Sequence, residues 1–368
     1  MYLQNYAQIH SYANVMTLTE RKKAFEGLGN FLRQFVGGQP VKDESVAFNE
    51  EYSDDFLNLI TLSQSHNRWF TPDQVRFAIG SWADALTSEN LDKWLSRYDL
   101  DNINPKTVGL ILAGNIPLVG FHDFLSVLIS GHRVLVKTSS DDKHLLPFLG
   151  RYLAVLEPRF SGRMQFVEGK LENFDAVIAT GSNNTARYFE YYFKDKPSII
   201  RKNRNSVAVL TGNESHEELV GLGEDIFRYF GLGCRNVSKL FVPEGYDFQP
   251  FFEAMYEHRD IINYEKYANN YDYNKAVFLM SNFKLLDNGF LTIKEDSSYG
   301  SPISSIFYEY YKDAPQLIKR LKDGAGKIQC VVASAEFPVS TIRFGKTQQP
   351  ALWDYADNVD TISFLTKI

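Results

Sequence analysis

Cysteine is scarce in this sequence, since only Cys234 and Cys330 occur among 368 residues. Two thiols are too few for the disulfide framework of a small secreted domain, and too few for a thiolate metal site without histidine ligands. The seven histidines are scattered, and none forms a His-Glu-x-x-His pair or another spacing typical of metal ligands. We therefore expect no metal centre.

Long apolar runs and an excess of positive charge are also lacking. The most apolar stretch, 108–121, is interrupted by Asn115 and Pro117, so it falls short of the roughly 20 apolar residues that a spanning helix needs. The first residues carry neither the cationic nor the apolar region of a secretory signal. The formal net charge of -6 provides no field that would attract nucleic acid or an anionic membrane. We expect a soluble, cytoplasmic protein with no membrane span and no nucleic-acid partner.

The residues that are present support more than one core, because 368 residues with 44% hydrophobic content exceed what a single core usually organises. The first hundred residues read as helices, with a capping box at Thr17-x-x-Glu20 and a helix start at Thr71-Pro72. From Lys106, short apolar runs alternate with amphipathic stretches, which predicts a parallel sheet with ligands at the carboxyl ends of its strands. The predicted strands are 107–113, 133–137, 164–167, 176–179 and 207–210, and the predicted helices between them are 118–129, 143–156 and 184–193.

A second run of the same kind follows a linking strand near Ser206. The stretch from Tyr264 to Asn274 is rich in Tyr and Asn without clear periodicity, which indicates a surface loop. The remaining predicted elements are helices 217–230, 248–258 and 315–322 and strands 240–242, 276–280, 303–310 and 328–333.

Five short stretches lie where these predicted elements end in loops. They are Asn115-Ile116-Pro117, Lys137-Thr138-Ser139-Ser140, Thr180-Gly181-Ser182, Arg201 to Leu210, and Gly231-Leu232-Gly233-Cys234. In order and spacing they resemble the aldehyde dehydrogenase superfamily, and more closely its acyl-CoA reductase branch (LuxC-like), the family of the bioluminescence fatty-acid reductase. The resemblance runs from about Val108 to the C-terminus.

This resemblance implies an α/β fold of the aldehyde dehydrogenase type, with two doubly wound parallel-sheet domains and an N-terminal helical region. Residues 1–205 would hold the N-terminal helices and the nicotinamide cofactor. Residues 206–345 would form the catalytic domain with the nucleophilic cysteine, and residues 346–368 would form a closing loop and strand.

Cys234 is the predicted nucleophile. It follows a Gly-Leu-Gly turn that permits close backbone approach, and backbone N–H dipoles with neighbours such as Arg235 could favour its thiolate. The alternative is a small buried hydrophobe, the usual role of a cysteine outside a disulfide; the other motifs in register favour catalysis. Cys330 lies in the alternating apolar run 327–334 of a core strand, and we assign it no function.

Asn115 places a polar side chain in an apolar strand-loop-helix unit, where a buried amide must find hydrogen-bond partners. By the resemblance, its side-chain amide and the backbone N–H of Cys234 form the oxyanion hole at the thioester carbonyl. The alternative is an asparagine that caps the next helix.

The resemblance assigns cofactor contacts to two loops. Lys137 matches the family lysine on the adenosine ribose, and Ser140 stands where many NAD-using relatives carry a Glu that would repel a 2'-phosphate. NADPH is therefore preferred and NADH remains possible, because Asp141 and Asp142 follow and could restore the repulsion. The Thr180-Gly181-Ser182 turn precedes a helix whose N-terminus can meet a pyrophosphate. The usual glycine-rich dinucleotide and phosphate-loop motifs are missing.

One departure from the family pattern selects the reaction. Hydrolytic aldehyde dehydrogenases carry a water-activating Glu about 33 residues before the cysteine, whereas Arg201 stands there in this sequence. An enzyme without that base would protect its acyl thioester from water, as NAD(P)H-dependent reduction of an acyl-CoA to an aldehyde requires. Arg201 or Lys202 could attract the acidic CoA, or form only a solvated basic turn.

Other assignments remain open at this stage. The thioester donor could be CoA or an acyl-protein, and the chain could form a homo-oligomer or a complex with an acyl-activating enzyme. The alternatives in function are a CoA-acylating aldehyde dehydrogenase working in the oxidative direction, and a non-catalytic acyl-carrying component of a fatty-acid-processing complex. Relatives place a Glu on the nicotinamide ribose where Ser297 stands here, so that contact falls to Glu295, to Asp296 or to neither.

Overall fold

The chain divides into two compact units. The computed structural model describes residues 16–334 and 337–368. The first unit contains residues up to Lys202 together with Ala351–Ile368, and the second contains Asn203–Pro350. We predicted boundaries after residues 205 and 345, and the functions assigned to those segments stay predictions. Within the described ranges, no helix is both long and apolar enough to cross a membrane.

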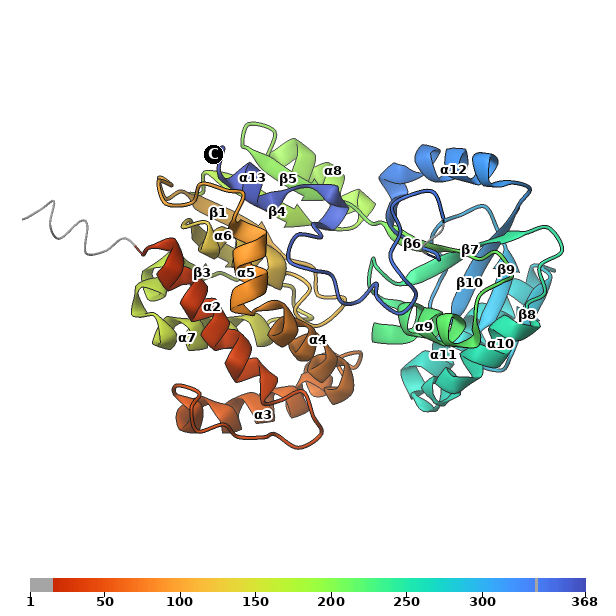
Figure 1. The fold of residues 1–368 in the computed structure, drawn as a ribbon, viewed down its shortest axis with the longest axis horizontal. Coiled ribbons are helices and arrows are strands. Elements are labelled where there is room, and N and C mark those ends of the chain that lie inside the picture. The colour runs from red at the N-terminus through yellow and green to blue at the C-terminus, as the bar shows by residue number, and fades with distance from the viewer. Residues whose placement is uncertain (1–15, 335–336) are drawn as a thin grey trace, which may run out of the picture. The chain divides into compact units, whose positions relative to one another are not determined.

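In the described part of the first unit four helices precede the sheet, and the first, third and fourth of them start at threonine caps. Thr17 and Glu20 form the predicted capping box, and Thr71 accepts a hydrogen bond from the Gln74 amide ahead of Pro72. The first of these helices packs against the third and against two later helices, α6 (Phe121–Ile129) and α7 (Leu145–Leu156) (Figure 1). The four helices are α2 (Leu18–Arg33), α3 (Asn49–His66), α4 (Pro72–Ala85) and α5 (Ser88–Leu95).

A five-stranded parallel sheet follows in the order β3-β2-β1-β4-β5. The direction in which strands are added reverses between β1 and β4, which is the switch point at which ligands of such sheets bind. The strands are β1 (Thr107–Ile111), β2 (Arg133–Lys137), β3 (Met164–Phe166), β4 (Ala176–Thr180) and β5 (Ser198–Arg201), and the helices are α6 (Phe121–Ile129), α7 (Leu145–Leu156) and α8 (Asn183–Tyr192).

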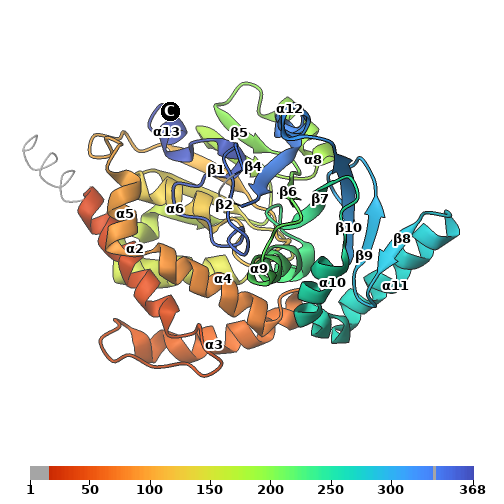
Figure 2. The same ribbon diagram turned by 45° about the vertical axis from the view of Figure 1, so that its right-hand side comes forward.

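The second unit contains a six-stranded sheet in the order β11-β6-β7-β10-β9-β8, in which only the edge strand β8 is antiparallel to its neighbour. Within this unit, α12 lies on one side of the sheet and α9 and α10 lie on the other (Figure 2). The strands are β6 (Asn205–Val209), β7 (Val237–Pro243), β8 (Leu285–Asp287), β9 (Thr292–Glu295), β10 (Ser305–Tyr311) and β11 (Ile328–Val332), and the helices are α9 (His216–Phe227), α10 (Gln249–Met255), α11 (Glu265–Met280) and α12 (Ala314–Asp323).

The predicted loop and strand between 264 and 280 are wrong, because α11 occupies this stretch. Its buried aromatics Tyr267 and Tyr271 stand four residues apart, as helix packing requires, and their hydroxyls bond Phe290 O and Asp287 Oδ1 at 3.1 and 2.7 Å. Because these side chains end in polar hydroxyl groups, hydrophobicity alone did not reveal the buried face of this helix.

Short strands were missed for a related reason. In β9, the buried Lys294 interrupts the apolar pattern, yet it pairs with Asp296 at 2.7 Å and lies 3.9 Å from the centre of the Phe283 ring. Its charge is compensated by this carboxylate and by the face of the aromatic ring, neither of which the alternation of apolar residues records. The other missed strands, β5 and β8, are four and three residues long.

The predicted C-terminal strand is also wrong, because the regular element of this segment is the helix α13 (Thr361–Leu365). The run Thr-Ile-Ser-Phe-Leu suits a strand as well as a helix. Asp360 decides the outcome, since its carboxylate accepts a hydrogen bond of 2.8 Å from the Ser363 amide at the helix start.

Arg201, the last residue of β5, ties this segment to the sheet. Its guanidinium forms a buried ion pair with Asp123 of α6 and donates to Thr361 Oγ1 at 3.2 Å. One charged group thus connects β5, α6 and α13 within the first unit.

Replacing Arg201 with Met should lower the free energy of unfolding by roughly 3–5 kcal/mol, because Asp123 would stay buried without its counter-ion. The neighbouring Lys202 forms an exposed pair with Glu190, so K202M is the matched control and should cost no more than about 1 kcal/mol. Denaturant unfolding measures both. Equal losses in the two variants would contradict a structural role for the Arg201 pair.

Candidate active site

The sequence-predicted residues of the first unit lie together at the carboxyl edge of its sheet. Strand register places Ile111 beside both Lys137 and Ala179, and Thr180 beside Arg201. The loops carrying Asn115, Ser140 and Thr180-Gly181-Ser182 therefore leave the sheet at one edge and flank the switch point.

The loops after β1 and β2 are fitted to each other. A β-carbon on Gly114 would lie only 2.6 Å from Ser139 Oγ, so this approach requires glycine. The Leu118 amide donates to Asp142 Oδ2 at 2.8 Å. Asn115, predicted to be buried, is exposed, because the apolar residues that follow it, Pro117 and Leu118, enter the core in its place.

Asp142 has a structural role that the sequence did not indicate. We expected its charge to stand near a cofactor phosphate, but it is 9% exposed and accepts from the loop backbone. Burial raises its pKa to about 6, although hydrogen bonds from the Leu118 and Leu145 amides oppose the rise. Of the two acidic residues after Ser140, only Asp141 is exposed.

The Thr180-Gly181-Ser182 turn is held from both sides. The Gly181 amide donates to the Arg201 carbonyl at 3.2 Å. Ser182 is the N-cap of α8, and its hydroxyl oxygen accepts from the Thr185 amide at 3.2 Å. The turn thus presents a helix N-terminus at the sheet edge, with the Ser182 oxygen already engaged in capping.

Cys234 lies in a turn of the second unit, just before β7, and is exposed. The turn is closed by the Asn236 amide, which donates to Gly233 O at 3.0 Å, and Ser206 Oγ donates to Cys234 O at 3.0 Å. Ser206 belongs to the start of β6, so the cysteine stands at the amino ends of these parallel strands. We expected ligands at the carboxyl ends of strands. The loops with the predicted cofactor residues follow the carboxyl ends of the first sheet, whereas this thiol stands at amino ends.

Cys330 is buried in β11, as predicted. The guanidinium of Arg235, the residue expected to favour the Cys234 thiolate, lies 3.5 Å from the Cys330 sulfur.

The segment after β9 runs close to the cysteine turn. A β-carbon on Gly300 would lie 2.8 Å from Asn205 Oδ1, next to the Ser206 that bonds Cys234.

Both carboxylate oxygens of Asp296 are engaged, one by Lys294 and one by the Ser298 amide, at 2.7 and 2.8 Å. Although burial opposes it, these hydrogen bonds lower the pKa of Asp296 to about 2. Glu295 is exposed and is the better candidate for a ribose contact.

Arg201 does not serve as the predicted CoA contact, because its guanidinium is buried against Asp123. Lys202 is the exposed member of the two and pairs with Glu190 at 2.6 Å. Arg201, which the sequence resemblance matched to the base of hydrolytic relatives, is thus a buried cation.

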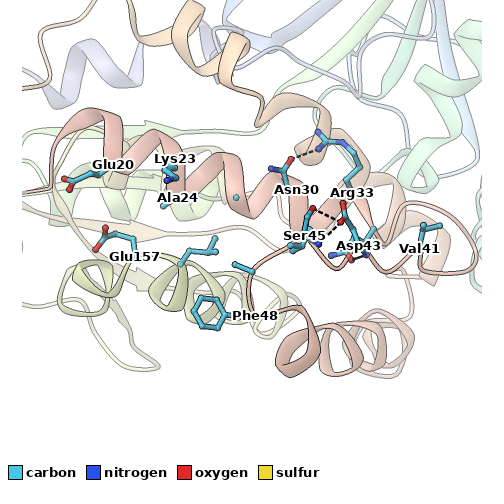
Figure 3. Close-up of a pocket in the computed structure, with 15 residues that line it drawn as sticks. Glu20, Lys23, Ala24, Asn30, Arg33, Val41, Asp43, Ser45, Phe48 and Glu157 are labelled. Atoms are coloured by element: carbon cyan, nitrogen blue, oxygen red, sulfur yellow. Dashed lines mark hydrogen bonds between the residues drawn. The ribbon is translucent and has the colours of Figure 1, made fainter.

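A cavity of about 840 Å³ lies elsewhere in the first unit, between α2, residues 41–48 and the end of α7. Glu20 and Glu157 lie at one end of it and Arg33 and Asp43 at the other (Figure 3). None of the sequence-predicted site residues lines this cavity, and its mixed charges favour no single ligand.

Comparison with known families gives one match, to the family described as acyl-CoA reductase (LuxC), over residues 44–258. This range includes Asn115, Lys137, Ser140, the Thr180-Gly181-Ser182 turn and Cys234. No curated protein matches the chain.

Solved structures give the fold. Aldehyde dehydrogenase 21 from Physcomitrella patens, in complex with the reaction product succinate, has a TM-score of 0.66 at 13% identity, over 96% of this chain and 84% of that one. The P. syringae indole-3-acetaldehyde dehydrogenase AldA, in complex with NAD+, has a TM-score of 0.60 at 14% identity, over 86% and 72%. An NADP dependent enzyme of E. coli has a TM-score of 0.60 at 16% identity, over 86% and 73%. These likenesses confirm the predicted aldehyde dehydrogenase-like fold.

The raised pKa of Asp142 predicts a pH-dependent stability difference. The folded state disfavours the ionised carboxylate, so the contribution of this group is greatest below the unfolded pKa near 4 and is lost as the pH rises to about 6. D142N cannot ionise, so its stability relative to the native protein should increase between pH 4 and 7, by at most roughly 3 kcal/mol.

Urea unfolding at several pH values tests this, with D141N as the control because it removes an exposed carboxylate from the same loop. The same pH dependence in both variants would show that burial of Asp142 is not the cause.

Proposed function

This chain belongs to the acyl-CoA reductase (LuxC) family, and we propose that it reduces an acyl-CoA or related acyl thioester to an aldehyde, using a reduced nicotinamide cofactor and a covalent acyl thioester on Cys234. Family membership makes the chain an oxidoreductase. The direction, the cofactor and the residue roles are our proposal.

The observation that carries the proposal is the exposure of Cys234 in a fixed turn. Of the two cysteines, it alone is exposed, and it lies inside the segment that matches the family. A thiolate is the strongest nucleophile among protein side chains near neutral pH, so an exposed cysteine at this family position supports covalent catalysis.

Arg201 supports reduction over hydrolysis. A buried guanidinium paired with Asp123 cannot accept a proton from water. An acyl-enzyme without a base at this position persists long enough to be reduced.

The reaction balances as follows. The Cys234 sulfur forms a bond to the carbonyl carbon, and the bond from that carbon to the CoA sulfur breaks, with CoA leaving as a thiolate. A bound reduced nicotinamide would supply a hydride, whose two electrons convert the acyl-enzyme to a thiohemiacetal oxyanion on Cys234. Collapse of this adduct releases the aldehyde and returns the electron pair to the Cys234 sulfur. By the family pattern, the Asn115 amide and the Cys234 backbone N–H stabilise the oxyanions.

The carboxyl edge of the first sheet fits a dinucleotide. The N-terminus of α8 offers a positive dipole end to a pyrophosphate. Lys137 and Ser140 leave the sheet at the same edge and would hold the ribose and its 2'-substituent.

We propose NADPH as the preferred cofactor, with NADH as the second possibility. Ser140 places no charge against a 2'-phosphate, and Asp142 is buried against the Leu118 amide. Among structures of similar fold, the P. syringae enzyme is in complex with NAD+ and the E. coli protein is described as NADP dependent, so both cofactors suit related folds.

Replacing Cys234 with Ala should abolish acyl-CoA-dependent oxidation of NADPH, by at least about a thousandfold in kcat/KM, because no other group can hold the acyl carbon. Replacing the buried Cys330 with Ala is the control and should retain activity within about threefold. Absorbance at 340 nm with acyl-CoAs of graded length measures both.

Three results would contradict the proposal. They are no turnover of any acyl thioester by the native protein, equal activity of the C234A variant, and turnover only when an aldehyde, CoA and NADP+ are supplied.

Replacing Ser140 with Glu should raise KM for NADPH by at least about tenfold relative to KM for NADH, because a carboxylate would face the 2'-phosphate. S140A is the control and should leave the ratio of the two KM values within about twofold. An unchanged ratio in S140E would place the 2'-phosphate away from Ser140.

A further inference from the structure

The cysteine turn contains a buried amide that the proposed mechanism does not use. Asn236 lies two residues after Cys234, immediately before β7, and is only 3% exposed. An amide that is buried this deeply must satisfy both its donor and its acceptor groups.

The donor end of Asn236 caps the end of α9. Its Nδ2 donates to the carbonyl oxygens of Asp225, Ile226 and Arg228, at 3.0, 3.3 and 2.8 Å. The last carbonyls of a helix have no partner within the helix. The chain after α9 turns through left-handed conformations at Tyr229 and Phe230, with φ of 52° and 58°. The Asn236 side chain thus supplies donors to carbonyl groups at this helix end.

The acceptor end of Asn236 holds the residue before the nucleophile. Its Oδ1 accepts from the Gly233 amide at 2.7 Å, and its own backbone amide donates to Gly233 O at 3.0 Å. Both polar backbone atoms of Gly233 are thus bound by a single residue. With Ser206 on the carbonyl of Cys234, the peptide units on both sides of the nucleophile have fixed directions.

The end of α9 is itself anchored from another direction. The carboxylate of Asp225, which is fully buried, accepts from the amides of Gly345 and Thr347 at 2.7 and 3.0 Å and from Thr347 Oγ1 at 2.8 Å. Asn236 thus connects the cysteine turn to a part of the second unit that cannot shift freely.

We propose that Asn236 is a positioning residue for Cys234. Its side chain fixes the turn 233–236 to the end of α9, and so sets the direction of the thiol and of the peptide N–H beside it. This inference rests on the proposed acyl-transfer role of Cys234, and it adds a residue whose effect is on kcat and not on substrate binding.

Replacing Asn236 with Ala should lower kcat for acyl-CoA reduction by about 10- to 100-fold while KM for acyl-CoA changes less than about twofold, because a misdirected nucleophile loses rate and retains binding. The matched control is N49A in the first unit. Asn49 is 9% exposed and exchanges hydrogen bonds of 3.1 and 2.9 Å with Gln34. It should lower the melting temperature to a similar extent without changing kcat.

N236D gives a second test with its own pH profile. The carboxylate can still accept from Gly233, but it would face three carbonyl oxygens in place of donating to them. When the introduced carboxyl group is protonated, it regains one hydrogen-bond donor. The activity of N236D relative to the native protein should therefore rise as the pH falls from 8 to 5.5. A constant ratio across this range would contradict the role assigned to the donor end.

Hydrogen exchange tests, without substrate, whether Asn236 fixes the turn 233–236 to the end of α9. The peptide covering 229–236 should exchange at least about tenfold faster in N236A than in the native protein. Its exchange rate should be unchanged in N49A. Unchanged kcat in N236A would show that the positioning role is wrong. If the native protein reduces no acyl thioester, the proposed function fails. Unchanged exchange in N236A would instead contradict the attachment of the turn 233–236 to α9.

Discussion

The parallel register of the first sheet is the constraint on which the arrangement of the candidate cofactor residues depends. Because β1, β2 and β4 run in the same direction and are paired in register at Ile111, Lys137 and Ala179, the loops that follow them must leave at one edge. The stretch from Lys137 to Ser140 lies far from Thr180 in sequence, and the two meet there through backbone hydrogen bonding alone. The chemistry of the edge then depends on side chains, but its location does not.

Buried carboxylates hold the loops of both units. Asp142 binds the backbone of the loop after β1, and Asp225 binds the backbone at Gly345 and Thr347. In both cases burial raises the pKa to about 6, and amide donors oppose the rise. Burying a charge costs free energy. Hydrogen bonds from several amides, which would otherwise be unpaired, to a single carboxylate offset this cost. Loop geometry at the site is thus stabilised by groups that take no part in the proposed reaction.

In the second unit, a sharp turn after α9 sets the direction of the chain before Cys234. Close to the nucleophile the chain needs a sharp change of direction, and it makes this change with left-handed residues at Tyr229, Phe230 and Gly231. The side chain of Asn236 donates to three carbonyl oxygens at the end of α9 and in this turn. The same side chain holds Gly233, so the strain of the turn and the direction of Cys234 are controlled together.

The sequence alone determined what depends on neighbouring residues: the cap at Thr17, the strands around Lys137 and Ala176, and the order of motifs that identified the family and fold. The tertiary structure decided the partners of buried polar groups. Arg201 reads as an exposed basic residue until Asp123 is found beside it, and Asp142 reads as a surface charge until the Leu118 amide is placed. The tyrosines of α11 suggest a loop for the same reason. These side chains are satisfied by groups brought close only by folding, and no local pattern records contacts made over long stretches of chain.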